Sequence, residues 1–537
     1  MGSCAKKYES FNDFLAKKMP VIEQTLDSLN YAYWEANSTG KEADYAEYEQ
    51  KQLELVKIFS DKDDFAYLKS LKESNQLTGH EKRMLDILYT NYLENSIPME
   101  LNEKIIKLST WIENTFNTYR PDLNGEKADN NKIYGILAES KNSAERKAAW
   151  EASKTVAEVI QDSLKKLVTL RNEAARSLGF ESYYEFSLST QEIDPEWLLN
   201  TFDALNEKLM PIFKEKKGEI DRILSKRYGM NPQDMRPWHY EDPFFQEAPA
   251  IYNVDLSGIY SKHDVVELSR TFFNGIGLNV DDILERSDLY PREGKYPHAQ
   301  CADLNRKGDV RIMCNVANND YWMNTMLHEL GHAVYSKYID RELPYLLRED
   351  AHILTTEGIA EFFGNFSLNP LWMKEMGLIS ERKMKKLNKD LHESQRTALL
   401  VFAQWAQVMV HFEYEMYHNP EQDLNSLWWN LVQKYQLVTP PENRNKPDYA
   451  AKIHVATVPV YYHNYLLGHI FAAQIENYIH HHFKPEKGQN HYVGRPEIGS
   501  FLKEKVFKPG KSIVWQEFIK QALGEPFNPD AFVDAVK

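Results

Sequence analysis

The segment that begins at His328 carries residue types that can hold a metal ion and activate water. His332 is four positions after His328, and Glu329 directly follows the first histidine. Residues four apart lie on the same face of an α-helix, so both imidazoles can bind one cation while the glutamate takes a proton from a nearby water. The pattern H-E-x-x-H therefore predicts a zinc site with Glu329 as the general base.

A catalytic zinc ion usually has three protein ligands. No third histidine follows His332 in the x-x-G-x-x-H arrangement, which excludes the metzincin subclass. The third ligand is then expected to be a downstream carboxylate, and the candidates are Glu349, Asp350, Glu357 and Glu361. Glu357 and Glu361 are one turn apart in an apolar segment, where a carboxylate needs a strong partner. We assign Glu357 as the third ligand, a gluzincin arrangement, and Glu361 as the carboxylate that orients a ligating histidine.

These side chains need rigid elements to hold them in place. Apolar residues recur at helical spacing over residues 322–334, which predicts a helix around the two histidines. The best strand signal, residues 310–316, ends just before it, and residues 354–366 predict a second helix. The site is therefore expected on two helices with a small β element beside them.

The rest of the chain also favours helices. Residues 8–120 show successive amphipathic patterns, residues 143–150 and 156–178 predict two more helices, and Pro195 suits the first turn of another. Residues 229–260 are rich in proline and suggest a boundary between an N-terminal helical lobe and a catalytic half.

Composition narrows the class of protein. The 537 residues include only 23 Gly and 23 Pro, and the formal net charge is −15. Few helix breakers support a mainly α fold, and the acidic balance without basic runs argues against nucleic-acid binding. The longest stretch without a charged residue, 453–475, contains histidines and a proline, so we interpret it as a buried helix and not as a membrane span.

Over most of its length the sequence resembles the peptidyl-dipeptidases related to angiotensin-converting enzyme, especially their bacterial members. The zinc motif with Glu357 carries the resemblance, together with residues 30–39 and the pair His298 and Ala299, which is similar to a strand that holds substrate backbone. The resemblance implies one peptidase domain, residues 8–537, built as a large two-lobed helical shell around a deep central cleft. Lid helices would occupy residues 8–120 and the catalytic core segment residues 290–475.

A second cluster also resembles that family. By this resemblance Lys452 and Tyr462 hold the C-terminal carboxylate of the substrate, His454 contacts the scissile region and Tyr465 stabilises the oxyanion. The match requires a one-residue insertion, so Tyr461 remains the alternative to Tyr462 as the carboxylate-binding tyrosine.

Three positions depart from the family pattern. Asn464 stands where vertebrate members place an arginine that coordinates an activating chloride, which argues against chloride activation. The glutamine that helps bind the carboxylate has Gln246 as its candidate here. Glu361 replaces an aspartate and is one methylene longer, so its contact with the histidine is expected to change.

The resemblance implies a zinc enzyme, with one Zn²⁺ per chain, that releases C-terminal dipeptides from oligopeptides with a free C-terminus. The alternatives are a thimet-type zinc oligopeptidase that cuts internal bonds and an inactive peptide-binding protein. The intact Glu329 argues against the inactive protein, because a pure binder does not need a general base.

Three cysteines exclude a disulfide framework, although one bridge between Cys301 and Cys314 stays open. No signal peptide is recognised at the start of the sequence. Cys4 is a candidate lipid anchor of a mature bacterial lipoprotein, so a periplasmic or cell-envelope location is slightly favoured over a cytoplasmic one.

Overall fold

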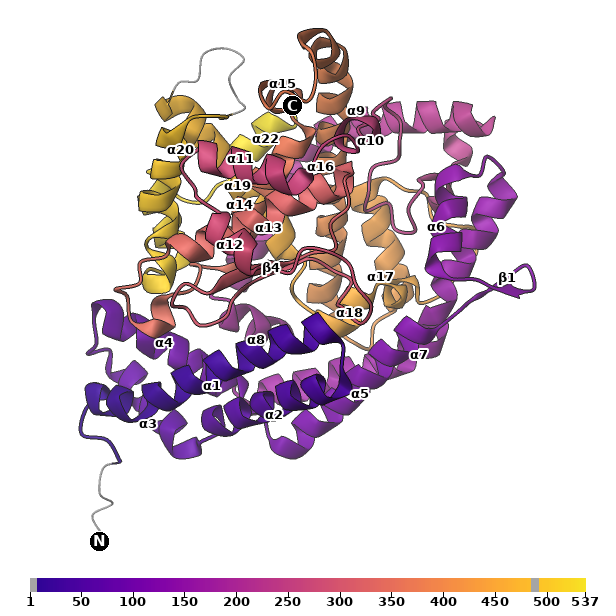
Figure 1. Cartoon of the computed structure of the whole chain (residues 1–537). Helices are drawn as coiled ribbons and strands as arrows, with labels where there is room; N and C mark the ends of the chain where they lie inside the picture. Colours follow the sequence, from indigo (N-terminus) through magenta and orange to yellow (C-terminus); the bar gives the residue numbers. More distant parts are fainter. Residues whose placement is uncertain (1–6, 484–491) are drawn as a thin grey trace.

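The computed structural model describes residues 7–483 and 492–537, which are mostly helical (Figure 1). The expected mainly α shell with a small β element is confirmed. Cys4 lies outside the described residues. In the described part of the chain, no helix combines the length and apolar character that crossing a bilayer requires.

Five helices form the N-terminal layer along the lower side of Figure 1, as the amphipathic patterns predict: α1 (Phe11–Thr39), α2 (Glu42–Phe59), α3 (Lys62–Ser74), α4 (Gly79–Glu94) and α5 (Met99–Thr118). Phe14, Leu68 and Tyr92 belong to a hydrophobic cluster of α1 to α4 that is separate from the main core. This cluster meets the rest of the chain at Leu346 and Leu347.

A long helix, α7, replaces the two helices expected between residues 143 and 178. The residues between them include no Gly or Pro, so nothing interrupts the backbone hydrogen bonds. The prediction that a helix begins at Pro195 is confirmed, since Asp194 caps it by accepting from the Trp197 N–H at 2.7 Å. The elements of this part are β1 (Asp122–Leu123), β2 (Glu126–Lys127), α6 (Asn130–Glu139), α7 (Ser143–Ser177), α8 (Tyr183–Thr190) and α9 (Pro195–Tyr228).

The small β element next to the zinc helix is an antiparallel pair in which Gln300 lies opposite Met313. It is shorter than the predicted strand because the backbone after Met313 bonds to residues 288 and 289 instead. Cys301 and Cys314 are both free thiols. The elements here are α10 (Ser257–Tyr260), α11 (Val265–Gly275), α12 (Asp281–Arg286), β3 (Gln300–Asp303) and β4 (Val310–Met313).

Helix α14 packs against both α13 and α19 at the centre of the main core. Both predicted zinc-site helices are present, but the single helix expected over residues 453–475 is two helices, with a break at residues 458–462 around Pro459. The helices of this half are α13 (Asp320–Tyr338), α14 (Ile353–Gly364), α15 (Pro370–Glu375), α16 (Glu381–His418), α17 (Leu424–Leu431), α18 (Ile453–Thr457), α19 (His463–Phe483), α20 (Pro496–Phe501), α21 (Trp515–Leu523) and α22 (Asp530–Ala535).

Candidate active site

His328, His332 and Glu357 come together as the zinc motif predicts. The two Nε2 atoms are 3.3 Å apart, and His328 Nε2 is 3.9 Å from Glu357 Oε2. All three candidate ligand atoms lie within 4.8 Å of one another. Zinc ligands at about 2.0–2.2 Å in tetrahedral geometry are separated by roughly 3.3–3.6 Å, so this donor set fits a zinc ion.

Both histidines are held in the neutral form that a metal requires. Burial lowers the pKa of His328, and it lowers the pKa of His332 well below its usual value. Nδ1 of His332 is 2.6 Å from the hydroxyl of Thr356, which leaves Nε2 facing the site. Such a contact fixes the orientation of a ligating imidazole. Thr356 was not predicted, because nothing in its local sequence marks it as a partner of His332.

Without a cation, the charged forms of the Glu329 and Glu357 carboxylates are destabilised. Burial and the nearby Glu357 raise the pKa of Glu329 to about 8. Burial, Glu361 and Asp350 raise the pKa of Glu357 to about 7. A divalent cation between these groups would offset their mutual repulsion.

Glu361 does not hydrogen-bond the zinc histidine. Its Oε1 is 3.7 Å from Nδ1 of His328, and its Oε2 is 3.6 Å from Nδ1 of His469 on α19. The longer side chain thus lies between two imidazoles, and its role in orienting His328 stays a prediction. His469 is a member of the site that the sequence did not single out.

The predicted carboxylate-binding residues form a second group. Lys452 is buried and donates from Nζ to Oε1 of Gln246, and its ammonium is 5.4 Å from the ring centre of Tyr462. Gln246 is held by Asp242, which accepts the N–H groups of Phe244 and Gln246 at 2.9 Å each. The structure therefore brings together the lysine, the tyrosine and the candidate glutamine.

The tyrosines of the 458–465 segment face different groups. The rings of His454 and Tyr462 are 5.2 Å apart, and those of Tyr462 and Tyr465 are 5.3 Å apart. Besides burial, Glu357 raises the pKa of Tyr461 and Tyr465, so both lie toward the metal cluster. The acidic groups that raise the pKa of Tyr462 are instead Asp242 and Glu247, the same two that act on Lys452. This geometry favours Tyr462 over Tyr461 as the partner of Lys452.

His298 and Ala299 lie immediately before β3 and not within it. The strand begins only at Gln300, and upstream of it the Tyr296 N–H donates to the Asn37 carbonyl at 2.8 Å. The His298 side chain is exposed and packs edge-on against Tyr296, with ring centres 5.3 Å apart. The structure does not bring it into the metal cluster.

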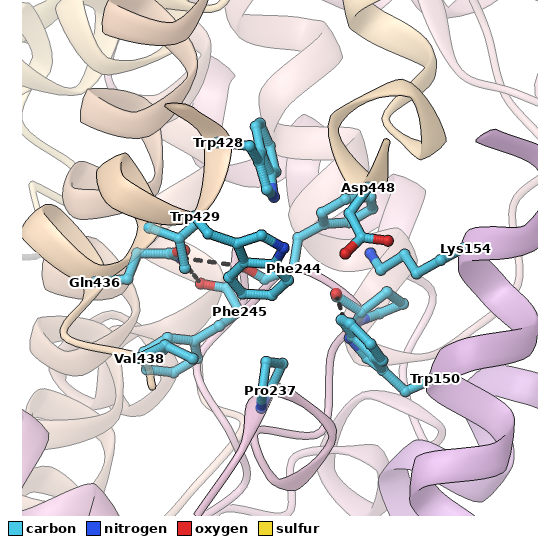
Figure 2. A pocket seen from close by; sticks show the side chains of 12 residues that line it. Trp150, Lys154, Pro237, Phe244, Phe245, Trp428, Trp429, Gln436, Val438 and Asp448 are labelled. Atoms are coloured by element: carbon cyan, nitrogen blue, oxygen red, sulfur yellow. Dashed lines mark hydrogen bonds between the residues drawn. The ribbon is translucent and has the colours of Figure 1, made fainter. Parts of the chain in front are cut away.

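Phe244, whose ring centre is 5.7 Å from Lys452 Nζ, lines a cavity (Figure 2). Its wall includes Trp150 and Asp448. Lys154 Nζ lies 3.1 Å from the Phe244 ring centre and points toward Asp448, and burial lowers its pKa to about 7. The Phe244 ring is thus close to the ammonium groups of two buried lysines, Lys154 and Lys452.

Two family profiles match the sequence. The one described as Peptidase family M3 matches residues 136–537, which include the whole metal cluster. The chain belongs to peptidase family M3. The profile described as Angiotensin-converting enzyme matches residues 5–239 of this M3 peptidase. The matches support an angiotensin-converting-enzyme-like metallopeptidase and imply zinc at the three-ligand cluster.

Individual relatives of the M3 peptidase point the same way. It is 24% identical over 438 residues to angiotensin-converting enzyme of Mesocricetus auratus, a match that covers 73% of this chain and 32% of the hamster protein. It is 24% identical over 430 residues to that of the leech Theromyzon tessulatum, covering 72% and 67% of the two chains. The matched region thus spans about a third of the length of the hamster relative.

Proposed function

We propose that this chain is a zinc-dependent peptidyl-dipeptidase that releases C-terminal dipeptides from oligopeptides with a free C-terminus. The observation that carries the proposal is the contact of Lys452 with Gln246 and Tyr462, close to the tyrosine that faces the metal cluster. A buried ammonium with an amide and a phenol beside it suits a carboxylate. Binding energy spent there would fix which peptide bond meets the metal.

Each residue has a role in the proposed reaction. Zinc held by His328, His332 and Glu357 would supply Lewis acidity for the scissile carbonyl and for water. Glu329 takes a proton from the attacking water and returns it to the leaving amine.

Two further residues act at the scissile carbonyl. Tyr465, with help from His454, donates a hydrogen bond to the oxygen that becomes negative; losing such a donor costs about 10²–10³ in rate. Ala299 and His298 are proposed to hold substrate backbone beside β3.

The overall organisation is part of the proposal. Residues 8–537 form one peptidase domain, residues 8–120 act as its lid and residues 290–475 form the catalytic core. Contact between the lid and the core supports this, since Tyr33 on α1 donates to Gln300 on β3 at 2.7 Å. A lid of this kind admits oligopeptides and excludes folded proteins.

We also retain the proposal of a bacterial member of this group in the periplasm or cell envelope, anchored through Cys4. The proposal rests on Cys4 alone, and mass analysis of the N-terminal peptide from the native host tests it.

We propose that chloride does not activate the enzyme through position 464. Asn464 is buried and neutral, and its amide donates to Oε1 of Gln191 at 2.8 Å. A chloride ion there would lack the cation that offsets its charge. Turnover in chloride and in acetate of equal ionic strength should agree within about twofold.

A second candidate, an oligopeptidase that cuts internal bonds, is favoured by membership of family M3. A free-carboxylate peptide and its C-terminally amidated twin separate the two, each digested with and without a zinc chelator. Chelator-sensitive release of dipeptides from the free peptide only supports the peptidyl-dipeptidase. Equal internal cleavage of both peptides would support the oligopeptidase.

The Lys452→Met variant sharpens this test. It keeps the length of the side chain but removes its charge, so KM for the free peptide should rise at least tenfold while zinc content is unchanged. A zinc-loaded wild-type protein that cuts neither peptide would leave the inactive peptide-binding protein as the remaining interpretation.

A further inference from the structure

Gln191 lies between the two halves of the active site. It is the C-cap residue of α8, and its backbone carbonyl accepts a hydrogen bond from Nε2 of His352 at 2.7 Å. His352 in turn caps α14, because its Nδ1 accepts the Leu354 N–H at 3.0 Å. The backbone of Gln191 is thus tied to the helix that carries Glu357.

The side chain of Gln191 reaches the other half. Its Oε1 accepts from Nδ2 of Asn464 at 2.8 Å and from Nε2 of His463 at 3.0 Å. Its Nε2 donates to the carbonyl of Val460 at 2.9 Å. Carbonyl oxygens only accept, so the Val460 contact fixes which way the amide points. One side chain therefore holds three residues of the segment that bears Tyr461, Tyr462 and Tyr465.

Val460 shows why this segment needs external support. It has φ of +54°, a left-handed conformation that a β-branched residue rarely adopts, and it is 1% exposed. Such a conformation persists only where the surroundings determine it. The Val460 N–H donates to Glu413 at 2.8 Å and its carbonyl accepts from Gln191, so both polar backbone groups of this turn are held from outside the segment.

We infer that Gln191 is a positioning residue for the proposed peptidase reaction, which fixes the 460–465 segment relative to the zinc-ligand helix. It touches no reacting atom. It acts by keeping Tyr465 at the oxyanion position and Tyr462 beside Lys452 while its own backbone is anchored to α14. The expected effect of Gln191 on catalysis rests on the proposed function, whereas its role in holding residues 460–465 does not.

Three variants test the inference. Gln191→Leu removes all side-chain hydrogen bonds, and Gln191→Glu keeps the acceptor for His463 and Asn464 but loses the donor to Val460. Gln407→Leu is the matched control, since the buried Gln407 likewise donates to a backbone carbonyl, that of Phe202 on α9 at 2.7 Å. The measurements are kcat, KM, zinc content and backbone hydrogen exchange of residues 461–465.

For Gln191→Leu we expect kcat to fall about 10–100-fold with KM changed less than about threefold, because a small misplacement of a group that acts in the transition state lowers kcat. Gln191→Glu should recover part of that loss. Amides of residues 461–465 should exchange at least tenfold faster in Gln191→Leu than in Gln407→Leu, with zinc content equal.

The inference is overturned if Gln191→Leu changes neither kcat nor exchange more than Gln407→Leu does. Should the wild-type protein release no dipeptides, the proposed function fails, and hydrogen exchange still decides whether Gln191 holds the segment. If Gln191→Leu does not fold, Gln191→Glu takes its place. It should then show a lower kcat and faster exchange of residues 461–465 than Gln407→Leu, and equality in both would overturn the inference.

Discussion

Among single residues, Lys452 combines a buried position with the need to stay charged. Burial lowers its pKa to about 8, and Asp242 and Glu247 oppose that shift. Gln246 contributes an acceptor that carries no charge. The ammonium is therefore solvated by neutral and distant groups, which leaves its charge available to a substrate carboxylate.

The substitution Gln246→Glu should prevent Lys452 from binding the substrate carboxylate. The new carboxylate would pair with Lys452 and repel the substrate terminus, so KM for a free-carboxylate peptide should rise about tenfold or more. Gln76→Glu, the same change at an exposed position, is the control. Steady-state kinetics of both variants check the prediction, and equal KM values would contradict it.

Glu413 should make stability depend on pH. Burial raises its pKa from 4.5 to about 8, so the folded chain keeps a proton that the unfolded chain loses. Stability should therefore decrease as pH rises from about 4.5 to about 8 and then level off. In Glu413→Gln, the decrease in melting temperature between pH 5 and pH 8 should be smaller by a few degrees. If the melting temperature falls equally in the variant and the wild type, a group other than Glu413 causes the pH dependence.

Sequence reasoning found the residues that belong to contiguous motifs and missed those that depend on packing. His328, Glu329 and His332 follow from one short pattern, and their geometry agrees. Thr356 and His469 join the site only because α14 packs against both α13 and α19. Such contacts between distant segments leave no signal in one sequence.

At the scale of helices, close approach explains the metal geometry. A Cβ built on Gly331 of α13 would lie 2.9 Å from the Ala360 Cα of α14, and one on Gly358 would lie 2.8 Å from the Gly468 carbonyl of α19. These distances are too short for a side chain to fit unless the backbone moves. Gly331 thus lets α14 approach α13, which brings the ligand atoms together, and Gly358 lets α14 approach α19.

Gly358→Ala should therefore separate α14 from α19 and weaken the site. We expect a loss of about 1–3 kcal/mol in unfolding free energy and a lower zinc affinity. Gly218→Ala is the control: this glycine lies inside α9 with nothing near its added Cβ, so the change should stabilise the chain by about 0.5–1 kcal/mol. Denaturant unfolding and zinc titration measure both effects. If Gly358→Ala changes neither the unfolding free energy nor the zinc affinity, close packing of α14 on α19 is not required for the site.

Helix existence was predictable, and helix ends were less so. The amphipathic patterns gave α1 to α5, but α7 is continuous because no breaker interrupts it. The break at residues 458–462 follows from Pro459 only once hydrogen bonds from Gln191 and Glu413 are seen to hold Val460. These partners lie on α16 and at the end of α8, far away in sequence.

For the whole molecule, zinc should act as a stabilising ligand because its donors come from two helices, α13 and α14, which a bound ion would hold together. At a free zinc concentration 100 times Kd, the folded state gains about 2.7 kcal/mol. Chelator treatment should lower the melting temperature by several degrees, and zinc should restore it. His332→Ala, which lacks one ligand, should show a much smaller response; an equal response would mean that zinc binds elsewhere.

Because the hydrophobic cluster of α1 to α4 is separate from the main core, we expect these helices to unfold as a smaller cooperative unit. A small unit with its own core opens at a lower free energy than the global transition. Partial unfolding of the N-terminal helices would then expose the face of β3 that Tyr33 contacts while the metal helices stay intact. Native-state exchange would reveal this as amides in residues 11–94 that exchange through a sub-global opening, and substrate entry would be limited by the frequency of that event.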